Sequence, residues 1–186
     1  MKKISLLFVL GMVSILSVTS CKKDDPIIEN EEEVITTLTY ALAPDGGGAS
    51  VVLSFKDLDG DGGNAPVIIG GTLAANTTYT GALTLLNETE TPAESITAEV
   101  LEEAVDHQFF FASSISGVSV AYDDVDPNGK PLGLATTLTT GAEGSGTISV
   151  TLRHEPNKSA SGVSAGDITN AGGETDIEVT FNVEIQ

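Results

Sequence analysis

The chain has 186 residues, with 8 Lys and Arg against 27 Asp and Glu, and its formal net charge is −19. This length suits one domain with a hydrophobic core and is too short for two large lobes. The acidic balance excludes nucleic acid as a partner, because phosphate binding needs clustered Lys and Arg and the six cations beyond residue 20 are scattered. A membrane contact would have to be hydrophobic or covalent.

The amino terminus has the pattern of a secretory signal peptide. Lys2 and Lys3 precede an uncharged, largely apolar stretch over residues 4–16, and small polar residues follow at 17–20. That stretch is too short to span a bilayer as a permanent helix, which needs about 20 residues. We therefore expect residues 1–20 to be removed as a signal peptide.

The single cysteine, Cys21, follows this segment directly. Residues 18–21, Val-Thr-Ser-Cys, resemble a bacterial lipobox, which implies cleavage before Cys21 and acylation of its sulfur and its new amino group. Several acyl chains anchor a protein stably, whereas one chain holds it only marginally. The alternative is an ordinary signal peptide followed by a cysteine that carries no lipid. Cleavage would remove Lys2 and Lys3 and change the net charge from −19 to −21.

Residues 21–33 are predicted to form an acylated, disordered, acidic tether. Lys23, Asp24 and Asp25 resemble the export signal that sends lipoproteins of the Bacteroidota type to the outer face of the outer membrane. The alternative is a solvated charged linker with no targeting role. Residues 26–33, PIIENEEE, continue the tether, because consecutive glutamates repel one another and offer little surface to bury. We therefore expect a lipid-anchored outer-membrane protein exposed at the cell surface.

Residues 34–186 show a period of two that indicates β-strands. The last twelve residues alternate between an apolar face with Ile177, Val179, Phe181, Val183 and Ile185 and a polar face with Asp176, Glu178, Thr180, Asn182 and Glu184. A similar alternation at 34–42 places Val34, Thr36, Leu38, Tyr40 and Leu42 on one face. Further strands are expected at 51–55, 78–86, 131–139 and 147–153. About eight or nine strands at this spacing predict a mainly β fold, an immunoglobulin-like antiparallel β-sandwich over 34–186.

Two segments depart from this alternation. Residues 107–112 have no polar face and are expected to form a central strand covered on both sides. Residues 92–106 are expected to form the one helix of the domain, with an apolar stripe and, at Thr91 and Glu94, the spacing of a capping box. Pro92 suits the first helical position, where no backbone N–H is needed.

An aspartate-rich loop is the first candidate metal site. Asp57, Asp59 and Asp61 stand at alternate positions and Gly62 follows, as in the first half of a calcium-binding loop, where hard oxygen ligands converge on one ion. The twelfth position, which usually carries a bidentate acid, is Ile68. The alternative is a glycine-rich turn with solvated aspartates.

A second loop repeats this pattern. Asp124, Asp126 and Asn128 occupy the alternate positions, Gly129 is sixth, and the twelfth residue is Ala135. The alternative here is an ordinary turn, because Pro-Asn-Gly forms a turn by itself. If these two loops bind Ca²⁺, the ion would be a cofactor that stiffens them; if they only connect strands, no cofactor is expected.

Acidic side chains also crowd the end of the predicted helix, and no Lys or Arg lies nearby to neutralise them. Glu103 and His107 are four residues apart, a spacing that suits a transition metal if the helix extends that far. His154 would complete a zinc or copper site if the fold brought it near His107. The alternative is a solvated acidic face with two unrelated histidines.

No enzyme activity is expected. No serine lies in a Gly-x-Ser-x-Gly motif, and the only cysteine is the predicted acylation site. Sugar-cleaving sites usually offer aromatic platforms, and this chain has three Tyr, six Phe and no Trp.

Three patterns resemble a group of small outer-membrane lipoproteins from flavobacteria: DHQF at 106–109, LRHEPN at 152–157 and GETDI at 173–177. The resemblance covers nearly the whole chain and implies no established activity. Members of the group often carry the label of the type 1 periplasmic binding fold. Binding proteins of that fold are two-lobed α/β structures, whereas the strand pattern here predicts a β-sandwich.

The function expected from the sequence is that of a non-catalytic binding or accessory module at the cell surface. Its partner would be the membrane, through acylated Cys21, together with another envelope protein or an extracellular ligand. The alternative is a metal-capture lipoprotein that delivers zinc or copper to an outer-membrane receptor through His107, His154 and nearby acids.

Overall fold

The computed structural model describes residues 33–60 and 63–186. The predicted signal peptide, Cys21 and the export signal at Lys23, Asp24 and Asp25 lie outside the described residues, as does Asp61 of the first candidate calcium loop. None of the helices in the described ranges combines the length and the apolar character needed to cross a membrane.

The described residues form ten strands and three short helices. The strands are β1 (Thr37–Pro44), β2 (Val51–Lys56), β3 (Val67–Ile69), β4 (Gly71–Leu73), β5 (Thr78–Leu86), β6 (His107–Ser113), β7 (Ser119–Tyr122), β8 (Ala135–Thr139), β9 (Gly144–His154) and β10 (Glu174–Ile185). The helices are the α-helix α1 (Ile96–Glu102) and two 3₁₀ helices, η1 (Val163–Ala165) and η2 (Ile168–Asn170).

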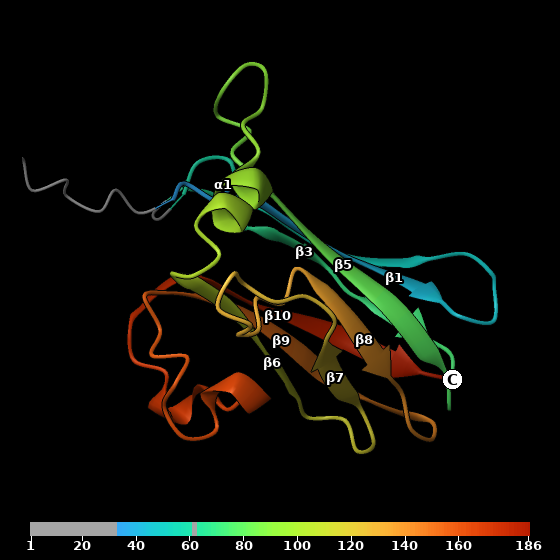
Figure 1. The fold of residues 1–186 in the computed structure, drawn as a ribbon. Coiled ribbons are helices and arrows are strands. Elements are labelled where there is room, and N and C mark those ends of the chain that lie inside the picture. The colour runs from blue at the N-terminus through green and yellow to red at the C-terminus, as the bar shows by residue number, and fades with distance from the viewer. Residues whose placement is uncertain (1–32, 61–62) are drawn as a thin grey trace, which may run out of the picture. The chain divides into compact units, whose positions relative to one another are not determined.

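The strands form two sheets that lie face to face (Figure 1). The larger sheet has the order β3-β2-β1-β5-β8-β7, and the smaller has the order β4-β10-β9-β6. One hydrophobic core contains fully buried side chains of both sheets, among them Leu38 and Tyr40 of β1 and Phe181 of β10. These two sheets around one core confirm the predicted β-sandwich.

The alternation of the last strand is confirmed. Ile177, Val179, Phe181, Val183 and Ile185 are all buried, and the residues between them point outward. The same holds for β1 from Leu38 to Leu42, but Val34 is 55% exposed because the strand begins only at Thr37. Alternation therefore identified the buried face correctly from Leu38 to Leu42 and from Ile177 to Ile185.

The sequence did not predict β3, β4 and β7, which have only three or four residues each. Such segments are too short for a periodic signal. Gly70 separates β3 from β4, and a Cβ atom there would lie 1.9 Å from the backbone oxygen of Asn182. Only glycine therefore lets the chain pass from one sheet to the other beside β10, where β4 forms the one parallel pair among the described strands.

Strand β6 is covered on both faces, as predicted, but it lies at the edge of the smaller sheet and not at its centre. Phe109 belongs to the main core, and Phe110 packs on the outer face against Val163 and Ala171 of the 157–173 loop. The backbone N–H of Phe109 donates to the Leu132 carbonyl at 2.7 Å, which covers the open edge. The apolar sequence of β6 thus reflects this loop and not a second neighbouring strand.

Helix α1 is shorter than the predicted 92–106 segment. The backbones of Asn87 and Glu94 exchange two hydrogen bonds of 3.1 and 3.0 Å, which hold the chain extended up to Glu94. The cap is therefore Ser95, whose hydroxyl accepts from the Ala98 N–H, and Thr91 does not cap the helix. Figure 1 shows α1 at one end of the sandwich beside β5, where Thr97 hydrogen-bonds the backbone of that strand at Leu85.

A buried lysine ties three segments together. The Lys158 ammonium donates to the backbone oxygens of Ala104 and Pro131 at 2.6 and 3.1 Å and to Oδ2 of Asp126 at 3.0 Å. Its side chain is 6% exposed and that of Asp126 is 1% exposed. Burial lowers the pKa of Lys158, and Asp126 partly opposes this shift. The ion pair joins the 157–173 loop to the end of α1 and to the segment before β8.

The core predicts a large difference between adjacent positions of β10. We expect Phe181→Ala to lower the free energy of unfolding by about 3–5 kcal/mol, because a fully buried ring leaves a cavity. The exposed neighbour Asn182 is the matched control, and Asn182→Ala should change stability by less than about 0.5 kcal/mol. Urea unfolding followed by circular dichroism measures both values. Equal values for the two variants would contradict the assignment of the buried face.

The ion pair predicts a second difference. Lys158→Ala leaves the Asp126 carboxylate buried without its cation and removes the donor to two carbonyls, so we expect a loss of about 3–5 kcal/mol in urea unfolding. Lys130→Ala is the control, because Lys130 lies in the same loop as Asp126 and has no ion pair within the described ranges. A loss below about 1 kcal/mol for Lys158→Ala would show that the pair is not a main support of this region.

Candidate functional site

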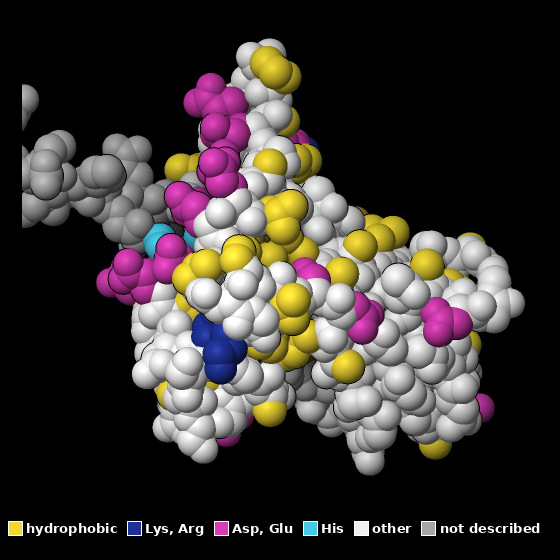
Figure 2. Space-filling model, in the orientation of Figure 1, with side chains coloured by type: hydrophobic (Ala, Val, Ile, Leu, Met, Phe, Trp, Pro, Cys, Tyr) yellow, Lys and Arg dark blue, Asp and Glu magenta, His cyan; other side chains and the backbone are white. Residues whose placement is uncertain are grey.

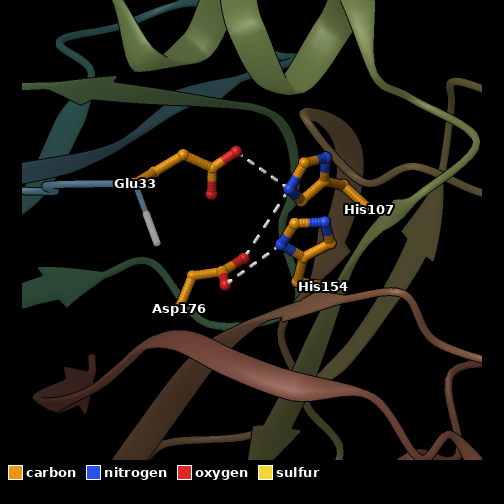
Figure 3. A group of neighbouring side chains, drawn as sticks. All are labelled: Glu33, His107, His154 and Asp176. Carbon is orange, nitrogen blue, oxygen red and sulfur yellow. Dashed lines mark ion pairs between the residues drawn. The ribbon is translucent and has the colours of Figure 1, made fainter. Parts of the chain in front are cut away.

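Two histidines and two carboxylates meet at one end of the sandwich (Figure 3). Glu33, His107, His154 and Asp176 each offer one ligand atom, and these atoms all lie within 4.8 Å of one another. We call these four residues the His–carboxylate cluster. Among the described residues it is the only group of three or more His, Cys, Asp or Glu side chains close enough to share a metal ion.

Strand pairing brings the two histidines together. In the antiparallel pair β6 and β9, His107 lies directly opposite His154, and their ring centroids are 4.6 Å apart. Both continue the inward-facing rows of their strands, which end at Phe109 and Leu152. The fold therefore brings His154 close to His107, which the sequence had left open as the condition for a shared metal site. The alternation of the 147–153 strand already carried this signal, because His154 falls in step with Leu152.

Asp176 reaches the cluster through a β-bulge. The register between β10 and β9 shifts between Thr175 and Ile177, so Asp176 has no direct partner on β9. The sequence placed Asp176 on the outer face with Glu178, but its side chain is only 2% exposed and faces the histidines. A bulge adds one residue and turns it to the other face. Strict alternation cannot reveal this, so sequence reasoning missed Asp176.

Glu33 reaches the cluster from the segment just before β1. The next residues hold it there: Ile35 packs on the core, and Thr36 bonds the Leu86 carbonyl through both its N–H and its hydroxyl. The sequence assigned Glu33 to the disordered tether, but its side chain is only 8% exposed. Nothing in a run of glutamates distinguishes the one that will be buried, so this residue was also missed.

The contacts within the cluster are close and largely hidden from solvent. Nε2 of His107 lies 3.0 Å from Oε1 of Glu33 and 3.8 Å from Oδ2 of Asp176, and Nδ1 of His154 lies 3.9 Å from Oδ1 of Asp176. The two imidazole side chains are 0% and 9% exposed. Within the described residues, Oε2 of Glu33 and Nε2 of His107 are buried without a partner in hydrogen-bond geometry. Buried polar atoms of this kind require an explanation, and a bound ion is one.

The backbone fixes the orientation of the His107 ring. Its Nδ1 lies 3.2 Å from the Glu103 carbonyl oxygen, which can only accept, so Nδ1 carries the proton. In the neutral ring the lone pair is then on Nε2, which faces the two carboxylates. Metal-binding histidines are commonly held by such a bond from their other nitrogen. Glu103, predicted as a ligand, thus contributes its carbonyl to the ring and not its exposed carboxylate to the cluster.

Glu33 and His107 shift each other's pKa. Burial alone would lower the pKa of His107, but the Glu33 carboxylate, together with the Glu103 carbonyl and the Asp176 carboxylate, holds that pKa above its ordinary 6.5. Burial alone would raise the pKa of Glu33, but His107, together with His154 and Asp176, holds that pKa below its ordinary 4.5. The cluster therefore favours positive charge between its carboxylates, and either a proton or a metal ion can supply it.

Further acidic side chains surround the cluster. Figure 2 shows acidic atoms gathered on the side of the sandwich where histidine atoms reach the surface. On α1, the pKa of Glu99 is raised by burial and by the nearby carboxylates of Glu94, Glu33 and Glu103. The crowding of acids predicted at the helix end thus extends to the cluster, where it strengthens the attraction for a cation.

In the first candidate calcium loop, Asp57 and Asp59 accept hydrogen bonds that shape a turn. Oδ1 of Asp57 accepts from the N–H groups of Asp59 and Gly60, and Oδ2 of Asp59 accepts from both nitrogens of Asn64. The backbone hydrogen bond from Asn64 holds the pKa of Asp59 below its ordinary value. Because Asp61 is not described, calcium binding by Asp57, Asp59 and Asp61 stays a prediction.

The second candidate loop is occupied by internal hydrogen bonds. Asp124 accepts from the N–H groups of Gly133 and Ala135. Asp126 accepts from the N–H groups of Asn128 and Lys130 and pairs with the Lys158 ammonium. A calcium ion held by Asp124, Asp126 and Asn128 would have to displace that ammonium. The arrangement thus favours the turn, and calcium here also stays a prediction.

The cluster predicts a pH dependence in protein treated with a chelator. A raised His107 pKa stabilises the fold fully below about pH 6.5, and this stabilisation is lost as the pH rises through the raised value. A lowered Glu33 pKa stabilises it above about pH 4.5 and is lost as the pH falls. We expect Tm to fall between pH 6 and pH 8 more in the native chain than in His107→Gln. Identical slopes in the two proteins would contradict the Glu33–His107 pair.

Comparisons with known protein families, with curated proteins and with solved structures found no match for this chain. The residues of the His–carboxylate cluster and their surroundings are therefore the basis for a functional conclusion.

Proposed function

We propose that this protein binds one transition-metal ion, with Zn²⁺ as the best fit, through Glu33, His107, His154 and Asp176. The observation that carries the proposal is the convergence of four buried ligand atoms within 4.8 Å. Burying two carboxylates beside two imidazoles costs solvation free energy that a shared cation offsets.

The types of ligand favour zinc over calcium. Zn²⁺ binds imidazole nitrogen and carboxylate oxygen at about 2.0–2.2 Å in a tetrahedral arrangement, which places neighbouring ligand atoms about 3.3 Å apart. The contacts of 3.0, 3.8 and 3.9 Å in the cluster lie on either side of this spacing. Calcium takes six to eight oxygen ligands, and this cluster offers two nitrogens.

The ligand count favours holding the ion over catalysis. Catalytic zinc sites usually have three protein ligands and an open position, whereas four protein ligands are typical of closed sites. His107 also has the backbone partner at Glu103 that orients a metal-binding ring. The proposed role is therefore capture and retention of the ion.

The sequence patterns at the amino terminus give this role its proposed setting. Acylation at Cys21 and the export signal at Lys23, Asp24 and Asp25 would hold the domain on the outer face of the outer membrane. A metal-binding module at that place fits the metal-capture alternative derived from the sequence. His107 and His154 belong both to the ligand set suggested by the sequence and to the cluster in the structure. The cluster has Glu33 and Asp176 as its acidic members in place of the Glu103 side chain.

Zinc addition tests the proposal directly. Free Zn²⁺ at about 100 times its Kd should stabilise the full chain, purified in a neutral detergent, by about 2.7 kcal/mol and raise Tm by about 5–10 °C. Titration calorimetry should give one ion per chain. Ca²⁺ at the same concentration should not reproduce the shift.

Two glutamine variants provide the matched comparison. Glu33→Gln removes a carboxylate of the cluster and should weaken Zn²⁺ binding by at least about 100-fold. Losing a residue that only supports a metal ligand usually costs about 10- to 100-fold in affinity, so the loss of a ligand itself should cost at least as much. Glu103→Gln should bind like the native chain, because only its backbone carbonyl contacts His107. No thermal shift with Zn²⁺ in the native chain, or equal weakening in the two variants, would overturn the proposal.

A further inference from the structure

A cavity of about 470 Å³ lies beside the His–carboxylate cluster. Its walls come from the Asp57–Gly60 turn, the 34–36 segment before β1, Thr89, and the bulged start of β10 at 176–178. Asp176 belongs both to this wall and to the cluster. The cavity therefore reaches a ligand of the proposed ion, while the cluster side chains themselves are at most 9% exposed.

The charged residues of the cavity wall are all acidic. Asp57 and Asp59 face it from the turn, and Glu178 and Asp176 come from β10. The nearest cation in sequence, Lys56, does not line this cavity and pairs with Glu88. A cavity lined by one sign of charge concentrates ions of the opposite sign and raises their association rate.

The His–carboxylate cluster offers ligand atoms to a cation that enters this acidic cavity. Oε2 of Glu33 is buried without a hydrogen-bond partner among the described residues, on a side chain that is 8% exposed. In Figure 3 the Glu33 and Asp176 carboxylates face the two imidazole rings from the same side. An ion arriving past Asp176 would meet this unsatisfied oxygen and the His107 Nε2 lone pair.

We propose that this cavity is the route by which the metal ion reaches the cluster, and that Asp57, Asp59 and Glu178 guide the ion electrostatically without binding it in the final site. The inference rests on the proposed function and adds a kinetic role to it. It also gives Asp57 and Asp59 a role that does not require a calcium ion of their own.

The test compares association rates of Zn²⁺ in two charge-matched variants of the full chain. The route variant is Asp57→Asn, Asp59→Asn and Glu178→Gln, where each replacement retains an oxygen for the existing hydrogen bonds. The control variant is Asp45→Asn, Glu143→Gln and Glu184→Gln. Asp45 directly follows β1, Glu143 directly precedes β9, and Glu184 lies near the end of β10. All three therefore lie at the end of the sandwich opposite the cluster. Both variants remove three negative charges.

Stopped-flow mixing with Zn²⁺ and a fluorescent zinc indicator measures the rates. At about 0.01 M salt, where charges act over about 30 Å, we expect association to slow by about tenfold in the route variant and by less than about twofold in the control. At about 1 M salt the three proteins should associate at similar rates. Glu178→Gln alone, an exposed single change, should give a smaller slowing of the same kind.

Each result separates the route from the site. Equal low-salt rates in the route and control variants, with one ion still bound per chain, would overturn the route and leave the metal site standing. The native chain binding no Zn²⁺ would overturn the metal site and the route with it. Selective slowing that salt abolishes would support both.

Discussion

Side chains on a β-strand alternate between two faces, so the register that joins β6 to β9 decides which residues enter the sandwich. Placing His107 opposite His154 also places Phe109 opposite Leu152 in the core. A slip of β6 by one residue against β9 would turn His107 and Phe109 outward, away from His154 and Leu152. The hydrophobic core and the His–carboxylate cluster are therefore set by the same pairing, and burial of the core stabilises the geometry of the cluster.

The cluster lies at the end of the sandwich where the pairing of β6 with β9 stops. There the buried side chains are charged or polar and no longer apolar. Two carboxylates and two imidazoles are held there by a bulge in β10, a hydrogen bond from His107 to the Glu103 carbonyl and the segment that leads into β1. Such a group is stable only when positive charge neutralises it. A proton on His107 and the proposed metal ion would compete for this role, because metal binding needs the deprotonated Nε2. Metal affinity should accordingly increase with pH while the chelated protein loses stability.

The sequence predicted the fold from features that are local and repeated. The residue pattern identified β5 as a strand, and alternation identified β10 together with its buried face, because a strand exposed on one side carries a polar residue at every second position. It could not identify β3 and β4, which have three residues each, nor the edge position of β6, because a covering loop leaves the same apolar pattern as a neighbouring strand. Helix α1 begins after the position predicted from the capping pattern at Thr91 and Glu94. The backbone pair between Asn87 and Glu94, a contact outside the helix, keeps the chain extended there.

The candidate site was predictable only in part, for similar reasons. Both histidines were singled out, and the alternation of β9 placed His154 inward. Asp176 depends on a bulge, and Glu33 depends on packing by its neighbours Ile35 and Thr36, and neither feature leaves a mark in residue type.

The position of Glu33 also has a mechanical consequence. Glu33 lies four residues before the start of β1, which is paired along its length with β2 and β5 inside the larger sheet. A pull from the amino-terminal side is therefore borne first by the contact between Glu33 and His107 and then, in shear, by two ladders of hydrogen bonds. An ion held by Glu33 would cross-link this segment to the other three ligands at the point where such a force acts on the domain.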